Sequence, residues 1–183
     1  MATAKELSTL IRIDIDDLQE AKFSEYEMLV LINSVLRIIN DKLCDTDSDL
    51  VEKETNLTMT DGYASLPSDF NSVIEVLSSD GSPLDFYPRS FKLDDGGYRI
   101  SSGNLYTTGD VTLVYKSTIT TITDLNSVLP LPDMFLEALR KLAVMMINKA
   151  TTDAIDLEIV KSIISKAQCR KFSHIERPMP FVV

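Results

Sequence analysis

Residues 24–43, SEYEMLVLINSVLRIINDKL, carry the clearest helical pattern in the 183-residue chain. Ser24 and Glu27 have the spacing of a capping box, in which each side chain satisfies a free backbone N–H of the first turn. Apolar residues then recur every three or four positions, as on one face of a helix: Met28, Leu29, Ile32, Val35, Leu36, Ile39 and Leu43. The stretch therefore predicts an amphipathic helix over residues 25–43 that forms the centre of a helical body.

A shorter helix precedes this one. Thr3 and Glu6 also have capping-box spacing, which predicts a helix over residues 4–12. Carboxylates follow it in the connection between the two helices: Asp14, Asp16 and Asp17. We interpret this connection as a solvated acidic loop, with a weak cation site as the alternative.

The chain changes character at residue 51. Between residues 51 and 122 it is rich in Thr, Val, Tyr and Ser, and Gly or Pro interrupts it every few positions, which is typical of short strands. The predicted strands cover 54–60, 63–66, 72–78, 84–87, 97–101, 104–107 and 110–117. Asp61-Gly62 and Asp80-Gly81 are predicted two-residue hairpin turns, because glycine adopts positive φ without a Cβ clash.

Helical patterns return after the strands. Pro132 and Asp133 suit the first turn of a helix over residues 133–149. Its apolar stripe consists of Phe135, Leu139, Leu142, Met146 and Ile147. A second helix is predicted over residues 154–170, and the two should pack as a hairpin. The last residues, 172–183, contain two prolines and are expected to be extended.

These segments predict an α+β fold. A helical body, made of an N-terminal helix, a long helix and a C-terminal helical hairpin, carries an inserted small antiparallel β domain and an extended C-terminal tail. The expected boundaries are 1–50 for the N-terminal helices, 51–122 for the β domain, 123–171 for the helical hairpin and 172–183 for the tail.

Metal and thiol chemistry have little support in the sequence. Asp45, Asp47 and Asp49 resemble the start of a calcium loop, but Leu50 stands at the glycine position and Asn56 at the bidentate acid position. We therefore interpret residues 45–49 as a solvated acidic loop. Cys44, Cys169 and the single histidine, His174, cannot form a zinc set, so we expect two thiols, no metal and no cofactor.

The charge of the chain argues against a general nucleic-acid or anionic-membrane binder. There are 28 acidic and 18 basic residues, which gives a formal net charge of −10. The N-terminus has no signal-peptide pattern, and no apolar run approaches the roughly 20 residues of a membrane span. We expect an intracellular, reducing setting and no membrane.

An enzyme remains an alternative. Serine or cysteine catalysis would depend on the one histidine, which lies in the tail. A small hydrolase built on two carboxylates that meet only in the folded chain is the form of enzyme that the sequence leaves open.

The C-terminal end differs in charge from the rest. Residues 161–183 contain five basic residues and one acidic residue. Cationic side chains suit the end of a helix, so a solvated helix terminus is one interpretation. The apolar tip of the chain favours an arm that docks on another protein, because free apolar residues are costly in water. The 12 residues after Lys171 would reach roughly 40 Å if extended.

The order of these segments resembles the head–tail connector, or adaptor, proteins in the necks of tailed bacteriophages. Residues 23–40, FSEYEMLVLINSVLRIIN, are similar to the N-terminal helix of that family, with Ile32-Asn33 as its central apolar-Asn pair. Residues 63–70, YASLPSDF, resemble its Y-x-L-P-x-D-F turn. Further similar stretches are VIEVL (73–77), GYRI (97–100), NLY (104–106), VTLVY (111–115) and LPLPDMFLEALRKLAVMMIN (129–148).

The resemblance implies a homo-oligomeric ring, commonly of twelve copies, between the portal protein and a downstream neck or tail protein. Genomic DNA would pass through the ring without sequence-specific binding, in a virion neck assembled from protein made in the host bacterial cytoplasm. The basic arm matches the segment by which family members attach, so portal contacts are expected from Phe172, His174, Ile175, Arg177, Pro178, Met179, Pro180, Phe181, Val182 and Val183. Another neck, tail-completion or tail-tube protein, or an interaction module without a channel, are the alternatives.

Overall fold

The computed structural model describes residues 1–46, 48–88 and 96–148, which fall into two compact units. The helical unit contains the described residues of 1–43 and 121–148, and the β unit contains those of 44–120. The described part of the chain is a mixture of helix and sheet, so the predicted α+β class is confirmed. The predicted helix over 154–170 and the predicted tail lie outside the described residues.

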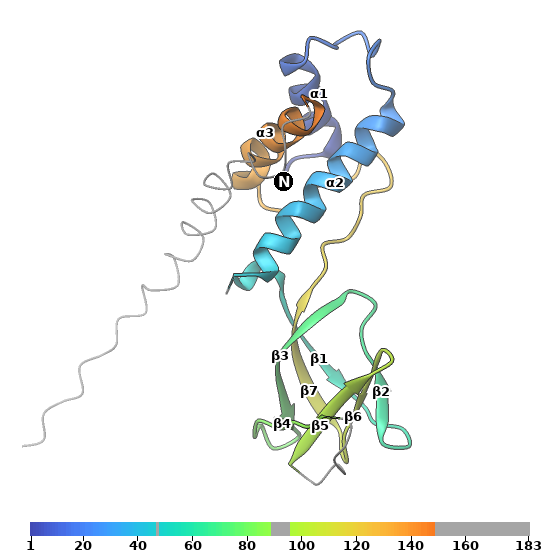
Figure 1. Cartoon of the computed structure of the whole chain (residues 1–183), viewed down its shortest axis with the longest axis vertical. Helices are drawn as coiled ribbons and strands as arrows, with labels where there is room; N and C mark the ends of the chain where they lie inside the picture. The colour runs from blue at the N-terminus through green and yellow to red at the C-terminus, as the bar shows by residue number, and fades with distance from the viewer. Residues whose placement is uncertain (47, 89–95, 149–183) are drawn as a thin grey trace, which may run out of the picture. The chain divides into compact units, whose positions relative to one another are not determined.

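The helical unit contains three α-helices, α1 (Ala4–Asp14), α2 (Glu25–Cys44) and α3 (Leu136–Ile147), among its described residues (Figure 1). Both predicted capping boxes are present. The Glu6 N–H donates to Thr3 Oγ1 at 3.2 Å, and the Thr3 N–H donates to Glu6 Oε2 at 2.8 Å. At α2 the Glu27 N–H donates to Ser24 Oγ at 3.3 Å, and the Ser24 N–H donates to Glu27 Oε2 at 2.8 Å. The helices predicted over 4–12 and 25–43 are thereby confirmed.

The third helix begins differently from the prediction. Residues Asp133–Phe135 form a 3₁₀ turn, η2, and α3 follows it directly. Along the predicted apolar stripe, Phe135, Leu139 and Leu142 are buried, whereas Met146 and Ile147 at the C-terminal end are half-buried.

All three helices contribute to the core of the helical unit. Its fully buried side chains include Leu7 and Ile11 from α1, Phe135 from η2 and Leu139 from α3. Six of the seven apolar residues predicted on α2 are buried, and Leu29 is half-buried. On the surface, the Arg140 guanidinium donates to both Asp14 carboxylate oxygens, at 2.7 Å from Nε and 2.5 Å from Nη2. This pair joins α3 to α1 and holds the pKa of Asp14 below its ordinary value.

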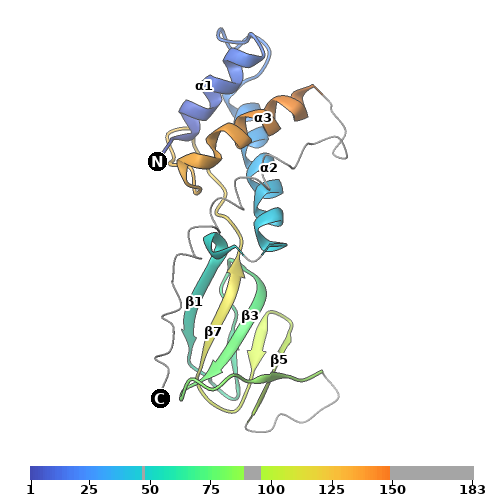
Figure 2. The same ribbon diagram turned by 90° about the vertical axis from the view of Figure 1, so that its left-hand side faces the viewer.

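The β unit contains two sheets and a short 3₁₀ turn, η1 (Asp49–Val51). The three-stranded sheet has the order β1 (Glu52–Leu57), β7 (Val111–Ser117), β3 (Phe70–Ser78), and both pairings are antiparallel (Figure 2). The four-stranded sheet has the order β2 (Tyr63–Ser65), β6 (Asn104–Tyr106), β5 (Gly97–Ser101), β4 (Asp85–Phe86). All seven predicted strands are present, most of them with shorter ends.

Both sheets share one core. On β7 the buried and half-buried residues alternate along the whole strand, as expected for a strand with one covered face. The buried cluster consists of Val76 from β3, Tyr98 from β5, Leu105 from β6 and Val111, Leu113 and Tyr115 from β7. The opposite faces of the two sheets are therefore the outer surfaces of the β unit.

One pairing corrects the prediction of an antiparallel β domain. Strand β4 pairs with β5 in parallel, through Asp85–Gly97 and Phe86–Tyr98. The chain before β4 is still bound to the three-stranded sheet, where Leu77 and Pro83 form an antiparallel bridge. It then joins the edge of the four-stranded sheet, where it runs in the same direction as β5. No local sequence pattern indicates that the chain passes from one sheet to the other at this point.

Of three hairpin turns among the described residues of the β unit, one forms as predicted, one has a different length and one was not predicted. Asp61 and Gly62 have φ of 54° and 81° in a two-residue turn, as predicted. At the second predicted turn only Gly81 has positive φ, and the Ser78 N–H donates to the Ser82 carbonyl at 2.8 Å. That loop therefore has three residues, a type I turn followed by a left-handed glycine. A two-residue turn that the prediction missed, residues 102–103, joins β5 to β6 with both φ values positive.

Gly97 allows a tyrosine ring to lie directly against the backbone of β5. A Cβ atom at this position would overlap the ring of Tyr87, whereas a Cβ at the neighbouring Gly96 would meet open space. We expect Gly97→Ala to lower the free energy of unfolding of the β unit by about 1–3 kcal/mol, the cost typical of overpacking. Gly96→Ala is the matched control and should change it by no more than about 0.5 kcal/mol.

Urea denaturation followed by tyrosine fluorescence measures this difference, because five of the six tyrosines lie in the β unit and the chain has no tryptophan. Equal midpoints for the two alanine variants would contradict a constraint at Gly97.

Candidate functional site

The ten residues predicted to contact the portal, Phe172 to Val183, all lie outside the described residues. Their role therefore stays a prediction. Within the described residues, the candidate features are the L-P-S-D-F turn, the Asn of the long helix, the acidic connections and the exposed faces of the two units.

Asp69, in the L-P-S-D-F turn, links three parts of the β unit. Its carboxylate accepts from Lys53 Nζ of β1 at 2.5 Å and from the Tyr115 hydroxyl of β7 at 3.0 Å. Its carbonyl accepts from the Thr118 N–H at 2.7 Å. The next residue, Phe70, stacks on Tyr115 with ring centroids 5.9 Å apart. The turn therefore joins the start of β3 to the end of β7, so its role is structural.

The same contacts shift the pKa values of Asp69 and Tyr115. The hydrogen bond from Lys53 is the largest cause that lowers the pKa of Asp69, and it outweighs the opposing effect of burial. Burial and the hydrogen bond to Asp69 raise the pKa of Tyr115. The ionised carboxylate is thus the form that the fold stabilises.

We expect Asp69→Asn to destabilise the β unit by about 1 kcal/mol near neutral pH, because the carboxylate is partly exposed and solvent screens its contacts. Since the folded pKa lies below the unfolded one, the contribution is present above about pH 4 and is lost as the pH falls through the folded pKa. The stability difference between wild type and variant should therefore shrink between about pH 5 and pH 2.

Urea midpoints over that pH range measure the effect. Asp85→Asn is the control, because Asp85 is exposed and makes no side-chain hydrogen bond to another described residue. A difference between wild type and Asp69→Asn that is independent of pH would contradict the assigned role.

Asn33, the polar member of the Ile32-Asn33 pair, holds a backbone segment from the far end of the sequence. Its Nδ2 donates to the Ile122 carbonyl at 2.9 Å, and its Oδ1 accepts from the Ile122 N–H at 2.9 Å. Ile122 is buried, and the segment around it has no regular secondary structure. One amide side chain thus satisfies both polar groups of a buried residue where the chain re-enters the helical unit.

We expect Asn33→Asp to lower the free energy of unfolding of the helical unit by about 1–3 kcal/mol, because aspartate cannot donate to the Ile122 carbonyl. Asn33→Leu removes both bonds and should cost more. Ser34→Ala is the control: Ser34 bonds only within α2, to the Val30 carbonyl, and its loss should cost about 0.5 kcal/mol or less. Urea denaturation followed by helical circular dichroism measures the series. An Asn33→Asp midpoint equal to that of Ser34→Ala would refute the role of Asn33 in holding Ile122.

The connection between α1 and α2 corrects the prediction of a solvated acidic loop. Asp17 is buried and accepts from Arg12 Nη1 at 2.9 Å, from the Lys22 N–H at 2.7 Å and from the Phe23 N–H at 3.0 Å. Burial alone would raise the pKa of Asp17, but these backbone donors and the guanidinium lower it. Asp17 therefore acts as the internal anchor of the loop.

This loop encloses a pocket of about 410 Å³, lined by Asp16, Asp17, Leu18, Gln19, Ala21 and Lys22. Its buried acid is already neutralised by Arg12, whose Nη2 is buried without a partner among the described residues. The pocket thus holds a structural ion pair whose carboxylate is not available for a ligand.

The carboxylates of the described residues show no sign of a catalytic acid. A hydrolytic general acid needs a raised pKa. The pKa is lowered for every described carboxyl group with a resolved shift: Asp14, Asp17, Glu27, Asp69, Asp80 and Asp133. Across the described ranges, no three His, Cys, Asp or Glu side chains gather as a metal site would require. Cys44 forms no disulfide with a described residue, and its thiol donates to the Ser117 carbonyl at 3.9 Å. Cys169 lies outside the described residues.

The outer face of the four-stranded sheet has a row of side chains that sequence reasoning missed. Tyr63 lies opposite Tyr106, and Tyr106 lies opposite Arg99, so the three cross β2, β6 and β5 on one face. The two rings are 5.8 Å apart, and the Arg99 guanidinium lies 4.8 Å from the centre of the Tyr106 ring. The row arises from strand register, which the separate strand patterns do not reveal.

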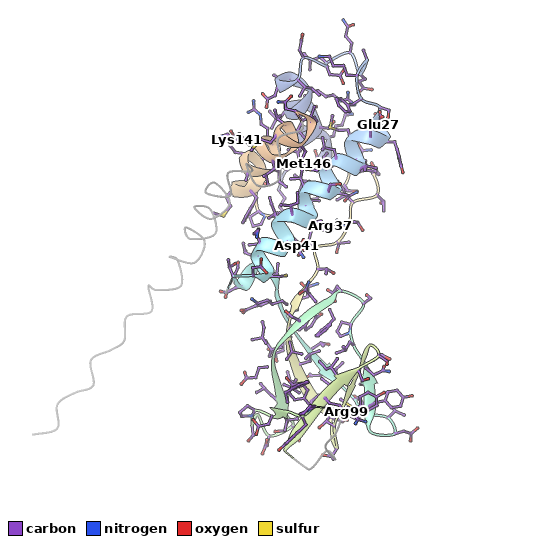
Figure 3. The ribbon with its side chains drawn as sticks, viewed as in Figure 1. Glu27, Arg37, Asp41, Arg99, Lys141 and Met146 are labelled. Carbon is purple, nitrogen blue, oxygen red and sulfur yellow. The ribbon has the colours of Figure 1, made fainter. Side chains whose placement is uncertain are left out.

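The helical unit exposes apolar side chains as well. On α2, Tyr26 is 75% exposed, and Val30, one turn further along, is 48% exposed. Leu18 in the acidic loop is 63% exposed. Arg37 and Asp41 continue the exposed side of α2 (Figure 3). Exposed aromatic and apolar side chains of this kind are the type that protein partners cover. Separately, no helix among the described residues is long and apolar enough to span a membrane.

The family model described as SU10 adaptor protein matches residues 2–159, which is most of the chain. No curated protein matches it.

Proposed function

The chain belongs to the SU10 adaptor protein family, and from this premise we propose that it is a structural head–tail connector that forms a ring on the portal and passes DNA to the tail. The family is a phage head–tail adaptor family, so the resemblance drawn from the sequence is confirmed, and the protein is a virion component that interacts with other head or tail proteins. Such a family also indicates a structural role and not an enzymatic one.

The match over residues 2–159 is the observation that carries the proposal. It includes α1, α2, both sheets and α3, so the shared pattern covers both units. In the proposed organisation, a β domain (51–122) is inserted into a helical body (1–50 and 123–171), and residues 172–183 form an arm. The half-buried Asn33 and the buried Asp17 serve the fold, which leaves function to the exposed surfaces.

Charge supports the passage of DNA. The whole chain carries a formal net charge of −10, and the β unit alone has thirteen acidic and five basic residues. An acidic channel wall repels phosphate and lets a duplex slide without sequence-specific binding. In the proposed ring, commonly of twelve copies, the channel would be lined by part of this acidic surface.

The arm is the proposed contact with the portal. Four basic residues of 161–171 precede it, it carries Arg177 itself, and its tip is apolar. An extended segment that becomes ordered on a partner can cover a large surface. The next neck or tail protein would then bind on the other side of the ring.

We expect removal of residues 172–183 to reduce co-purification with the portal protein of the same phage by about tenfold or more, since the arm supplies the contact. Helical circular dichroism and the urea midpoint should stay unchanged. Replacing the same residues with an equally long Gly/Ser sequence is the control for length, and it should fail to bind in the same way. Portal binding by the truncated chain at wild-type strength would refute the arm, and a wild-type chain that never binds the portal would refute the connector itself.

A further inference from the structure

The β unit has two outer faces of different chemistry. The Arg99 face is the outer side of the four-stranded sheet, with the row Tyr63, Tyr106 and Arg99. The glutamate face is the outer side of the three-stranded sheet, where Glu54 of β1 and Glu75 of β3 lie opposite Val114 of β7. Because the two sheets cover a common core, these faces lie on opposite sides of the unit.

The Arg99 face has hydrogen-bond donors without partners. Nε of Arg99 is buried and unpaired among the described residues, and the guanidinium has no ion pair with a described carboxylate. The hydroxyls of Tyr63 and Tyr106 are likewise without a hydrogen bond to a described residue. Strands β2, β5 and β6 contain no acidic residue, although the β unit has thirteen. The face is therefore suited to a ligand rich in acceptor oxygens and negative charge.

The glutamate face offers such a ligand. Glu54 and Glu75 are exposed, and neither forms an ion pair or a side-chain hydrogen bond with another described residue. Between them Val114 is half-buried, which places one apolar side chain between two carboxylates. A tyrosine ring can pack on this valine, while a guanidinium pairs with either carboxylate in a forked geometry.

We propose that the Arg99 face of one copy docks on the glutamate face of the next copy. The two faces of one β unit point away from each other, so they can meet only between copies. A contact between unlike faces is heterologous, and it propagates head to tail until it closes as a ring. The inference rests on the proposed connector, because only there does a repeated contact of this kind have a use.

Charge complementarity favours a second copy over nucleic acid as the occupant. A duplex that approached Arg99 would also meet the field of a β unit whose net charge is −8, which repels phosphate. A single carboxylate from an equivalent unit can reach the guanidinium without placing a long polyanion along the acidic surface.

Two charge reversals and their mixture test the proposal. Arg99→Glu and Glu54→Arg should each weaken self-association by about tenfold or more, because each places like charges against one another. An equimolar mixture of the two variants should associate as wild type does, since every contact between alternating copies again joins opposite charges. Sedimentation velocity over a range of concentrations, at about 50 mM salt to limit screening, measures all four samples.

Arg37→Glu and Asp41→Arg on α2 are the matched controls, with the same charge changes at exposed positions outside the β unit (Figure 3). They should associate like wild type. The mixture also guards against misfolding, because two unfolded variants cannot restore one another.

Three results would overturn the inference: association of Arg99→Glu equal to that of Arg37→Glu, a mixture no better than its components, or wild type that stays monomeric at every concentration. In each of these cases, portal binding is measured as well. A chain that still binds the portal would show that only the proposed interface is wrong, whereas a chain that never binds it would show that the proposed connector is wrong.

Discussion

The pairing of Asn33 with Ile122 is the contact on which the helical unit depends. The chain leaves this unit after residue 43 and returns at residue 121 with no helix or strand to satisfy its backbone until η2. Asn33 supplies a donor and an acceptor in register with a single residue, as an adjacent strand would. The return then continues against the N-terminus, where the Ala4 N–H donates to the Ser127 carbonyl and the Leu129 N–H donates to the Ala2 carbonyl, both at 2.9 Å. A helix can thus fix an irregular segment through one amide, which carries a donor and an acceptor on two separate atoms.

Features set by neighbours in sequence were predictable, and those set by distant partners were not. Both capping boxes and the strand positions follow from spacing, because the interacting groups are within a few residues of each other. The burial of Asp17 required Arg12 and two backbone N–H groups to converge on it, and a run of acids alone indicates only exposure. The parallel β4–β5 pair and the Tyr63–Tyr106–Arg99 row depend on strand order, which no single strand encodes. The candidate arm was identified by composition, and its ten residues lie outside the described part of the chain.

The acidic residues of this family member form two groups with different physical roles. Asp14, Asp17 and Asp69 are bound to cationic side chains, so their charge is offset within the fold. Exposed acids such as Glu54 and Glu75 are not offset in this way by the described residues. The surface field of the protein therefore comes mainly from the second group, and this is the field that other head or tail proteins would meet. For a protein that works through assembly, the division separates the charges that specify the fold from those that specify contacts.

Strand β1 has a consequence for the behaviour of the protein at high local concentration. It is an outermost strand of its sheet, so one side of its backbone is not paired within that sheet, and its first three residues, Glu52, Lys53 and Glu54, are all exposed. Charged side chains at such a margin discourage the addition of a foreign strand, which would have to bury them beside its own. Copies of the chain at high local concentration are thereby protected from uncontrolled growth of one continuous sheet. The charged residues of β1 thus act against aggregation, independently of the contact proposed for Glu54.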